Sequence, residues 1–158
     1  MTITVGVNSY VSVSDADTYF NERLYADDWT SADSTTKEKA LVMARRFIDQ
    51  QQFSGERANA DQLLAWPRSG IAGVDSSVVP QDVVFAQCEL ALAFIRSDLT
   101  VNNATFGVRS LREQVGPIVT ETVYDGRAPV RTLPDAVSAF LRPYFAAASS
   151  ANSVAMVL

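Results

Sequence analysis

Residues Pro80–Leu99, PQDVVFAQCELALAFIRSDL, carry the most apolar helical pattern of this 158-residue chain. Pro80 has the backbone angle of a first helical turn, and Asp82 puts a negative charge where the helix dipole favours one. Apolar side chains then surround nearly the whole helix, which is typical of a helix enclosed by protein. Gln87 and Glu89 interrupt the run, and a bilayer span needs roughly 20 apolar residues. We predict a central helix whose apolar surface is covered by other helices, by neighbouring subunits, or by both.

Three further helices are predicted, so we expect a mainly α fold, a small helical bundle around the central helix. A short helix over Asp15–Leu24 follows a weak capping-box pattern that starts at Ser14. An amphipathic helix is predicted over Thr35–Gln51 and a last helix over Pro134–Phe145, which Pro143 should kink or end. The inner face of the first helix is expected to carry Tyr19, Phe20, Arg23 and Leu24. Outside any helix we expect Asp27, Asp28 and Trp29.

The segment Phe53–Gly73 is predicted to be a long loop, because it contains three glycines and a proline. It also contains the apolar residues Leu63, Leu64 and Trp66, so it should fold onto the core or serve a function. Two interpretations of Trp66-Pro67-Arg68 stay open. It is either a site that anchors a partner, since Trp and Arg dominate such sites, or a plug that seals the loop onto the domain.

Residues Phe106–Tyr124 are predicted to form an extended β-hairpin or arm within a domain that spans residues 1–145. The runs Val108–Val115 and Ile118–Tyr124 flank a Gly-Pro pair, and the second run alternates as a strand does. Residues 146–158 form an uncharged tail that ends in apolar residues. Such a tail is either flexible or docked on a partner.

Composition argues against several function classes. The chain has 13 basic and 18 acidic residues, a net charge of −5, and therefore lacks the basic character of most nucleic-acid-binding domains. It has no histidine and one cysteine, Cys88, which leaves no residues for a zinc site or a histidine-activated nucleophile. We expect no enzymatic activity, no cofactor and no metal. The N-terminal run shows no signal-peptide pattern, so we expect synthesis in a cytoplasm.

Several segments in a fixed order resemble a family of tailed-bacteriophage head–tail connector (adaptor) proteins. The most specific is the run Gln62–Gly70, QLLAWPRSG, and the likeness covers most of residues 10–145. The other segments are Tyr10–Phe20, Trp29, Phe47–Asp49, Gly55, Val79–Pro80, Glu89–Ala91, Val115–Pro117 and Leu133–Pro134. Some members of this group carry the label "DnaT-like single-stranded DNA-binding", so a single-stranded DNA-binding module is the alternative function.

The resemblance implies a helical subunit that assembles as a ring, often of twelve copies, beneath the portal protein. Such a ring extends the DNA channel and meets a stopper or tail completion protein on its other face, at the neck of the virion. Double-stranded DNA is expected to pass without specific binding, because an acidic channel repels phosphates. No membrane partner is expected. The candidate partner-binding residues are Trp66, Arg68, Val115, Ile118, Tyr124, Val154, Met156, Val157 and Leu158.

Overall fold

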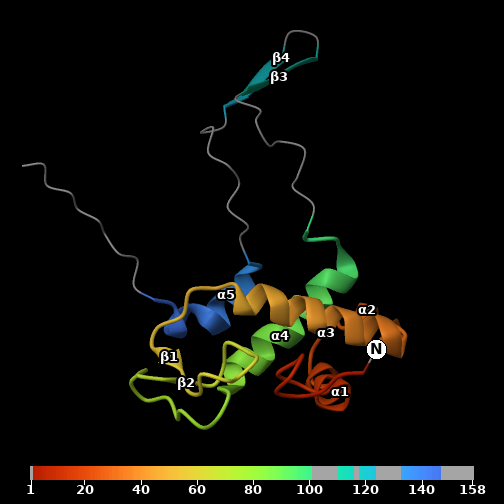
Figure 1. Ribbon diagram of the computed structural model, residues 1–158. Helices are drawn as coiled ribbons and strands as arrows, with labels where there is room; N and C mark the ends of the chain where they lie inside the picture. The colour runs from red at the N-terminus through yellow and green to blue at the C-terminus, as the bar shows by residue number, and fades with distance from the viewer. Residues whose placement is uncertain (1, 101–109, 116–117, 124–132, 147–158) are drawn as a thin grey trace, which may run out of the picture.

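The computed structural model describes residues 2–100, 110–115, 118–123 and 133–146, and the fold is mainly α as predicted (Figure 1). Helices and strands follow one another as α1 Val13–Asn21, α2 Asp27–Ser31, α3 Ser34–Asp49, β1 Glu56–Arg57, β2 Arg68–Ser69, α4 Gln81–Arg96, β3 Ser110–Val115, β4 Ile118–Val123 and α5 Asp135–Leu141. A 3₁₀ turn over Arg142–Tyr144 continues α5. The chain also makes one antiparallel bridge between Phe53 and Phe145, which joins the long loop to the C-terminal segment.

Helix α4 is the central helix, as the sequence predicts. It packs against α3 and α5. Helix α1 meets α4 at Phe85 and Glu89, and α2 meets it near its C-terminal end, where Asp28 pairs with Arg96. Every residue from Ala86 to Leu92 is buried. The helices of the same chain therefore cover most of the apolar surface predicted for α4. Val84 and Phe85 in its first turns, and Phe94 and Ile95 at its C-terminal end, are only partly buried.

The N-terminal region departs from the prediction in three ways. Ser12, not Ser14, caps α1: its Oγ accepts from the Asp15 amide at 3.1 Å and donates to the Asp15 carboxylate at 2.6 Å. Residues 27–31 form the short helix α2, because two acidic residues occupy its first turn, where the dipole favours them. Trp29 of α2 is buried and donates to Asp17 at 2.8 Å. Leu24 lies on no inner face, because α1 ends before it and its side chain is exposed.

The remaining helices match the sequence closely. Helix α3 starts at Ser34 because Asp33 caps it by accepting from the Thr36 amide at 3.0 Å. Helix α5 gives way to the 3₁₀ turn where Pro143 removes a backbone donor, so the predicted end of this helix is confirmed.

Strands β3 and β4 form an antiparallel hairpin, which confirms the predicted arm in its central part. The register pairs Ser110 with Val123 at one end and Val115 with Ile118 at the other. Figure 1 shows this hairpin standing apart from the helices. The outer parts of the predicted arm, residues 106–109 and Tyr124, lie outside the described residues, as does the tail from residue 147 onward.

Candidate functional site

The Trp66 side chain is fixed inside the domain. It is 1% exposed and its ring packs edge-on between Phe53, at 5.3 Å between ring centroids, and Tyr144, at 5.2 Å. The Trp66–Pro67 peptide is cis. The indole nitrogen finds no hydrogen-bond partner within the part of the chain that the structure describes. These contacts match the interpretation of Trp66 as a plug between the long loop and the C-terminal segment.

Arg68 also works within the loop. Its guanidinium donates to the carbonyl oxygens of Ser54 at 2.8 Å, Gly55 at 2.7 Å and Ala65 at 3.2 Å. Burial, followed by repulsion from Arg57, lowers the pKa of this guanidinium. The same stretch of chain pairs as β1 and β2. Arg68 also donates to the Phe53 carbonyl oxygen at 3.4 Å, so one rigid cation satisfies four backbone acceptors and stabilises the loop.

Tyr10, in the N-terminal segment before α1, holds the long loop in place at a second point. Its hydroxyl donates to the Asp49 carboxylate and accepts from the Trp66 amide at 3.3 Å. Arg45 donates to the other oxygen of Asp49 at 3.2 Å. Burial, reinforced by the negative charge of Asp49, raises the pKa of Tyr10 well above its ordinary value. The N-terminal segment, α3 and the long loop are thus joined through one polar cluster.

The buried carboxylate of Glu89, in the middle of α4, binds residues of the N-terminal region. It accepts from the Tyr19 hydroxyl at 2.7 Å and from Arg23 Nη2 at 2.9 Å. Arg23 Nη1 also donates to the carbonyl oxygens of Leu24 at 2.6 Å and Tyr25 at 3.2 Å. A polar residue that interrupts the apolar pattern of α4 therefore serves to hold the chain between α1 and α2.

That chain segment is an exposed apolar turn. Leu24 is 78% and Tyr25 80% exposed, and Tyr25 has a left-handed backbone with φ of 58°. Arg96, at the end of α4, donates to the Tyr25 carbonyl oxygen and, through Nε, to Asp28 at 2.8 Å. We call these two residues the Leu24–Tyr25 turn. Arg23, which directly precedes the turn, and Arg96 of α4 hold its backbone, while both of its side chains lie in solvent.

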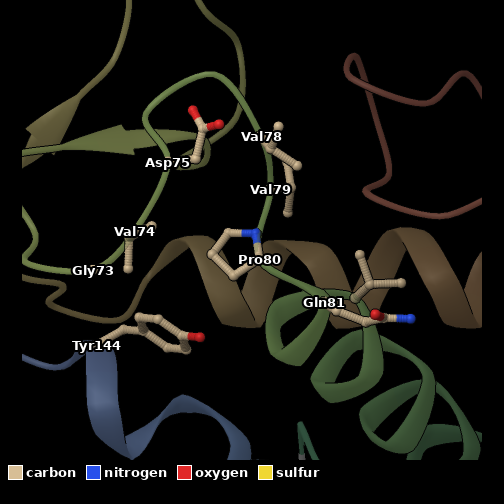
Figure 2. A pocket seen from close by; sticks show the side chains of 9 residues that line it. Gly73, Val74, Asp75, Val78, Val79, Pro80, Gln81 and Tyr144 are labelled. Carbon is tan, nitrogen blue, oxygen red and sulfur yellow. The ribbon is translucent and has the colours of Figure 1, made fainter.

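An open pocket of about 460 Å³ lies at the other end of α4 (Figure 2). It lies between the loop before α4, the first turns of α4 and the C-terminal segment. Its lining residues are Gly73, Val74, Asp75, Val78, Val79, Pro80, Gln81, Val84 and Tyr144, and we call it the valine pocket. The Tyr144 hydroxyl donates to Asp82 at 2.8 Å, and burial with this hydrogen bond raises the pKa of Tyr144 to about 12.

Reactive chemistry is sparse in the described residues. Burial raises the pKa of the Cys88 thiol to about 12, so the thiolate is scarce at neutral pH. Among the residues that the structure describes, no cluster of three or more cysteine and carboxylate side chains could hold a metal ion. None of the described helices could span a lipid bilayer.

The structure brings together only some of the predicted partner-binding residues. Trp66 and Arg68 are neighbours in the long loop, and Val115 and Ile118 pair at one end of the hairpin. Outside the described residues lie Tyr124, Val154, Met156, Val157 and Leu158. The Leu24–Tyr25 turn and the valine pocket were not predicted as sites. The one available signal, an apolar pair between two polar stretches at residues 21–28, is too short to separate from an ordinary turn.

A comparison with protein-family models gave a match that covers nearly the whole chain. The family is described as "Putative DnaT-like ssDNA binding protein", and its model matches residues 2–158. No curated protein and no solved structure gave a significant match.

Proposed function

The chain belongs to the family described as "Putative DnaT-like ssDNA binding protein", and within that family we propose that it is a structural head–tail adaptor of a tailed bacteriophage. In this proposal its copies form a ring, of about twelve members by the resemblance described above, beneath the portal protein. The ring extends the DNA channel and offers its other face to a stopper or tail completion protein. The work of the chain is to hold proteins in place, without catalysis or a cofactor.

The observation that carries the proposal is the hairpin of β3 and β4. An isolated two-stranded hairpin is marginally stable in water, and each of its outer edges presents unpaired backbone groups. Here the two strands pair only with each other within the described residues, and they stand apart from the helices. Such an element gains stability when a neighbouring chain adds a strand or lies across it. A ring supplies that neighbour at every position.

The long loop supports the same proposal in another way. Trp66 is packed inside the subunit, and Arg68 donates to backbone carbonyl oxygens of the same loop. The loop therefore gives a rigid body from which the hairpin and the tail can reach partners. The net charge of −5 suits a channel wall past which double-stranded DNA slides without specific binding. The proposed location is the neck of the virion, after synthesis in the host cytoplasm.

Size-exclusion chromatography with light scattering, with the portal protein of the same phage, tests this function. We expect a stable complex that holds many copies of the chain. The single variants Val119→Pro and Thr120→Pro each remove one backbone donor from β4. Successive N–H groups of a strand point to opposite sides, so one of these two donors faces β3 and the other faces the open edge. Both variants should keep the helical circular dichroism and lose the portal complex. A wild-type chain that stays monomeric beside the portal would refute the adaptor proposal.

Single-stranded DNA binding is the second candidate function, because the description of the matching family names it. Fluorescence anisotropy with a labelled oligonucleotide separates the two functions. Micromolar binding that weakens steeply with added salt would support DNA binding, since released counterions then drive association. Absence of binding at low salt would remove this candidate and leave the adaptor proposal untouched.

A further inference from the structure

We propose that the Leu24–Tyr25 turn of one copy inserts into the valine pocket of a second copy, so that the subunits join head to tail. This inference rests on the proposed ring and names the surfaces that would close it. It assigns a role to the most exposed large apolar side chains of the described residues and to the open pocket at the other end of the central helix.

The Leu24–Tyr25 turn is built to stay in one shape. Its two carbonyl oxygens receive hydrogen bonds from Arg23 and Arg96, and Arg23 is itself held by the buried carboxylate of Glu89. Because the backbone is already fixed, binding has to order only the two side chains and not the turn itself. Tyrosine is a common anchor residue at such interfaces because it combines a large ring with one polar tip.

The valine pocket complements the turn chemically. Most of its lining is apolar, from valines, a proline and the ring of Tyr144, and Val78 at its rim is 56% exposed. The Tyr25 hydroxyl makes no hydrogen bond within the described residues and needs an acceptor when it is buried. Asp75 at the pocket has one carboxylate oxygen, Oδ1, engaged by Ser77 at 2.8 Å and 2.7 Å. Its second oxygen is available to a phenol from another copy.

The two surfaces lie at opposite ends of one rigid element. Arg96, which holds the turn, ends α4, while Val84 of the pocket lies in its first turns. Twelve residues of helix separate them, a rise of about 18 Å. A surface at one end that fits a surface at the other makes a heterologous contact, which generates a ring when its rotation closes. Two copies joined this way would leave one free turn and one free pocket.

A mixing experiment tests the inference by sedimentation velocity, with the full chain alone and on the portal protein. The turn variant carries Leu24→Ser with Tyr25→Ser, and the pocket variant carries Val78→Asp. All three side chains are more than half exposed, so folding should be preserved, which circular dichroism checks. Each variant alone should lose self-association. A mixture of the two should recover dimers and nothing larger, because one turn and one pocket remain intact in each pair.

Matched controls separate this contact from other occupants of the pocket. Leu63→Ser removes an apolar side chain of similar exposure from the long loop and should leave assembly unchanged. A full chain in which Val154, Met156, Val157 and Leu158 are each replaced by Ser should keep its self-association in the absence of the portal protein. Loss of self-association in that chain, with self-association retained in the turn variant, would make the tail the occupant of the pocket and overturn the inference.

Cysteine cross-linking gives a second readout. A chain that carries both Tyr25→Cys and Val78→Cys should form a covalent ladder under mild oxidation, and each single variant should not. If the turn variant and the pocket variant each form a ring on the portal as the wild type does, this inference is overturned and the adaptor proposal stands. A wild-type chain that forms no ring and no portal complex would instead overturn the adaptor proposal itself.

Discussion

At the scale of single residues, the long loop depends most on Trp66. Replacement by alanine should lower the free energy of unfolding by about 3–5 kcal/mol, the cost of a large-to-small change in a core. Trp66→Phe should cost less, because it keeps a ring between Phe53 and Tyr144 and removes an indole N–H that lacks a partner in the described residues. Urea unfolding followed by circular dichroism measures both. Unchanged stability of Trp66→Ala with loss of portal binding would make this residue a partner anchor instead.

Two glycines of the same region give a matched pair. A Cβ on Gly55 would lie 2.1 Å from the Ser69 carbonyl oxygen, whereas a Cβ on Gly73 would meet no atom within 4 Å. Both have positive φ, at 66° and 76°. Gly73→Ala should therefore cost only left-handed strain, about 1–2 kcal/mol. Gly55→Ala should cost clearly more in the same unfolding assay, because the backbone just before β1 would have to move away from Ser69 of β2. Equal costs would contradict this close approach.

At the scale of elements, α4 carries a polar side chain that the core requires. Gln87 is fully buried: its oxygen accepts from the Tyr10 amide at 2.9 Å, and its nitrogen donates to Ser9 and to the Leu41 carbonyl oxygen, both at 2.8 Å. Gln87→Met keeps the size and adds apolar character. It should nevertheless destabilise, because each buried group left unpaired costs about 1–3 kcal/mol. Thermal unfolding measures this, and a stabilised Gln87→Met variant would contradict it.

Much of the element structure could be predicted from the sequence. Helix α4 was predicted to within a few residues because Pro80 and Asp82 mark its start and its apolar pattern is continuous. The hairpin was found because its second strand alternates and follows a Gly-Pro break. The start of α1 was missed by two residues, since Ser12 and Ser14 both precede acidic residues at capping distance and only the structure shows which hydroxyl bonds.

The candidate surfaces could not be predicted in the same way. The Leu24–Tyr25 turn is held by Arg96, which is about 70 residues away in the chain, and by Arg23 through Glu89. No local pattern reports such contacts. The valine pocket likewise needs Tyr144 beside Pro80, which depends on how α5 packs against α4. Long-range packing creates both surfaces, while periodicity records only which face of an element is apolar.

At the scale of the whole molecule, buried protons make stability depend on alkaline pH. Burial raises the pKa of Cys88 from 9.0 to about 12 and that of Tyr144 from 10.0 to about 12, and the pKa values of Tyr10 and Tyr19 are raised as well. Above the ordinary pKa values of 9.0 and 10.0, these groups lose their protons in the unfolded chain but keep them in the folded chain. The free energy of unfolding therefore falls as the pH rises. The free energy of unfolding should fall between about pH 9 and pH 12.

A matched variant identifies the first group to titrate. Cys88→Ala removes the thiol, so the decline should begin nearer the ordinary pKa of tyrosine, 10.0, than that of cysteine, 9.0. Urea titrations at a series of pH values measure the onset in both proteins. A curve that stays flat to pH 12, or an onset that does not move in Cys88→Ala, would contradict the buried-proton explanation.

The assembled state on the portal tests the proposed adaptor function most directly. Electron microscopy of the purified chain bound to the portal protein of its phage measures that state directly. We predict a closed ring of about twelve copies coaxial with the portal, in which each copy contacts the next through different surfaces. Isolated subunits that never join the portal, and that instead bind single-stranded DNA in a salt-dependent way, would contradict the account.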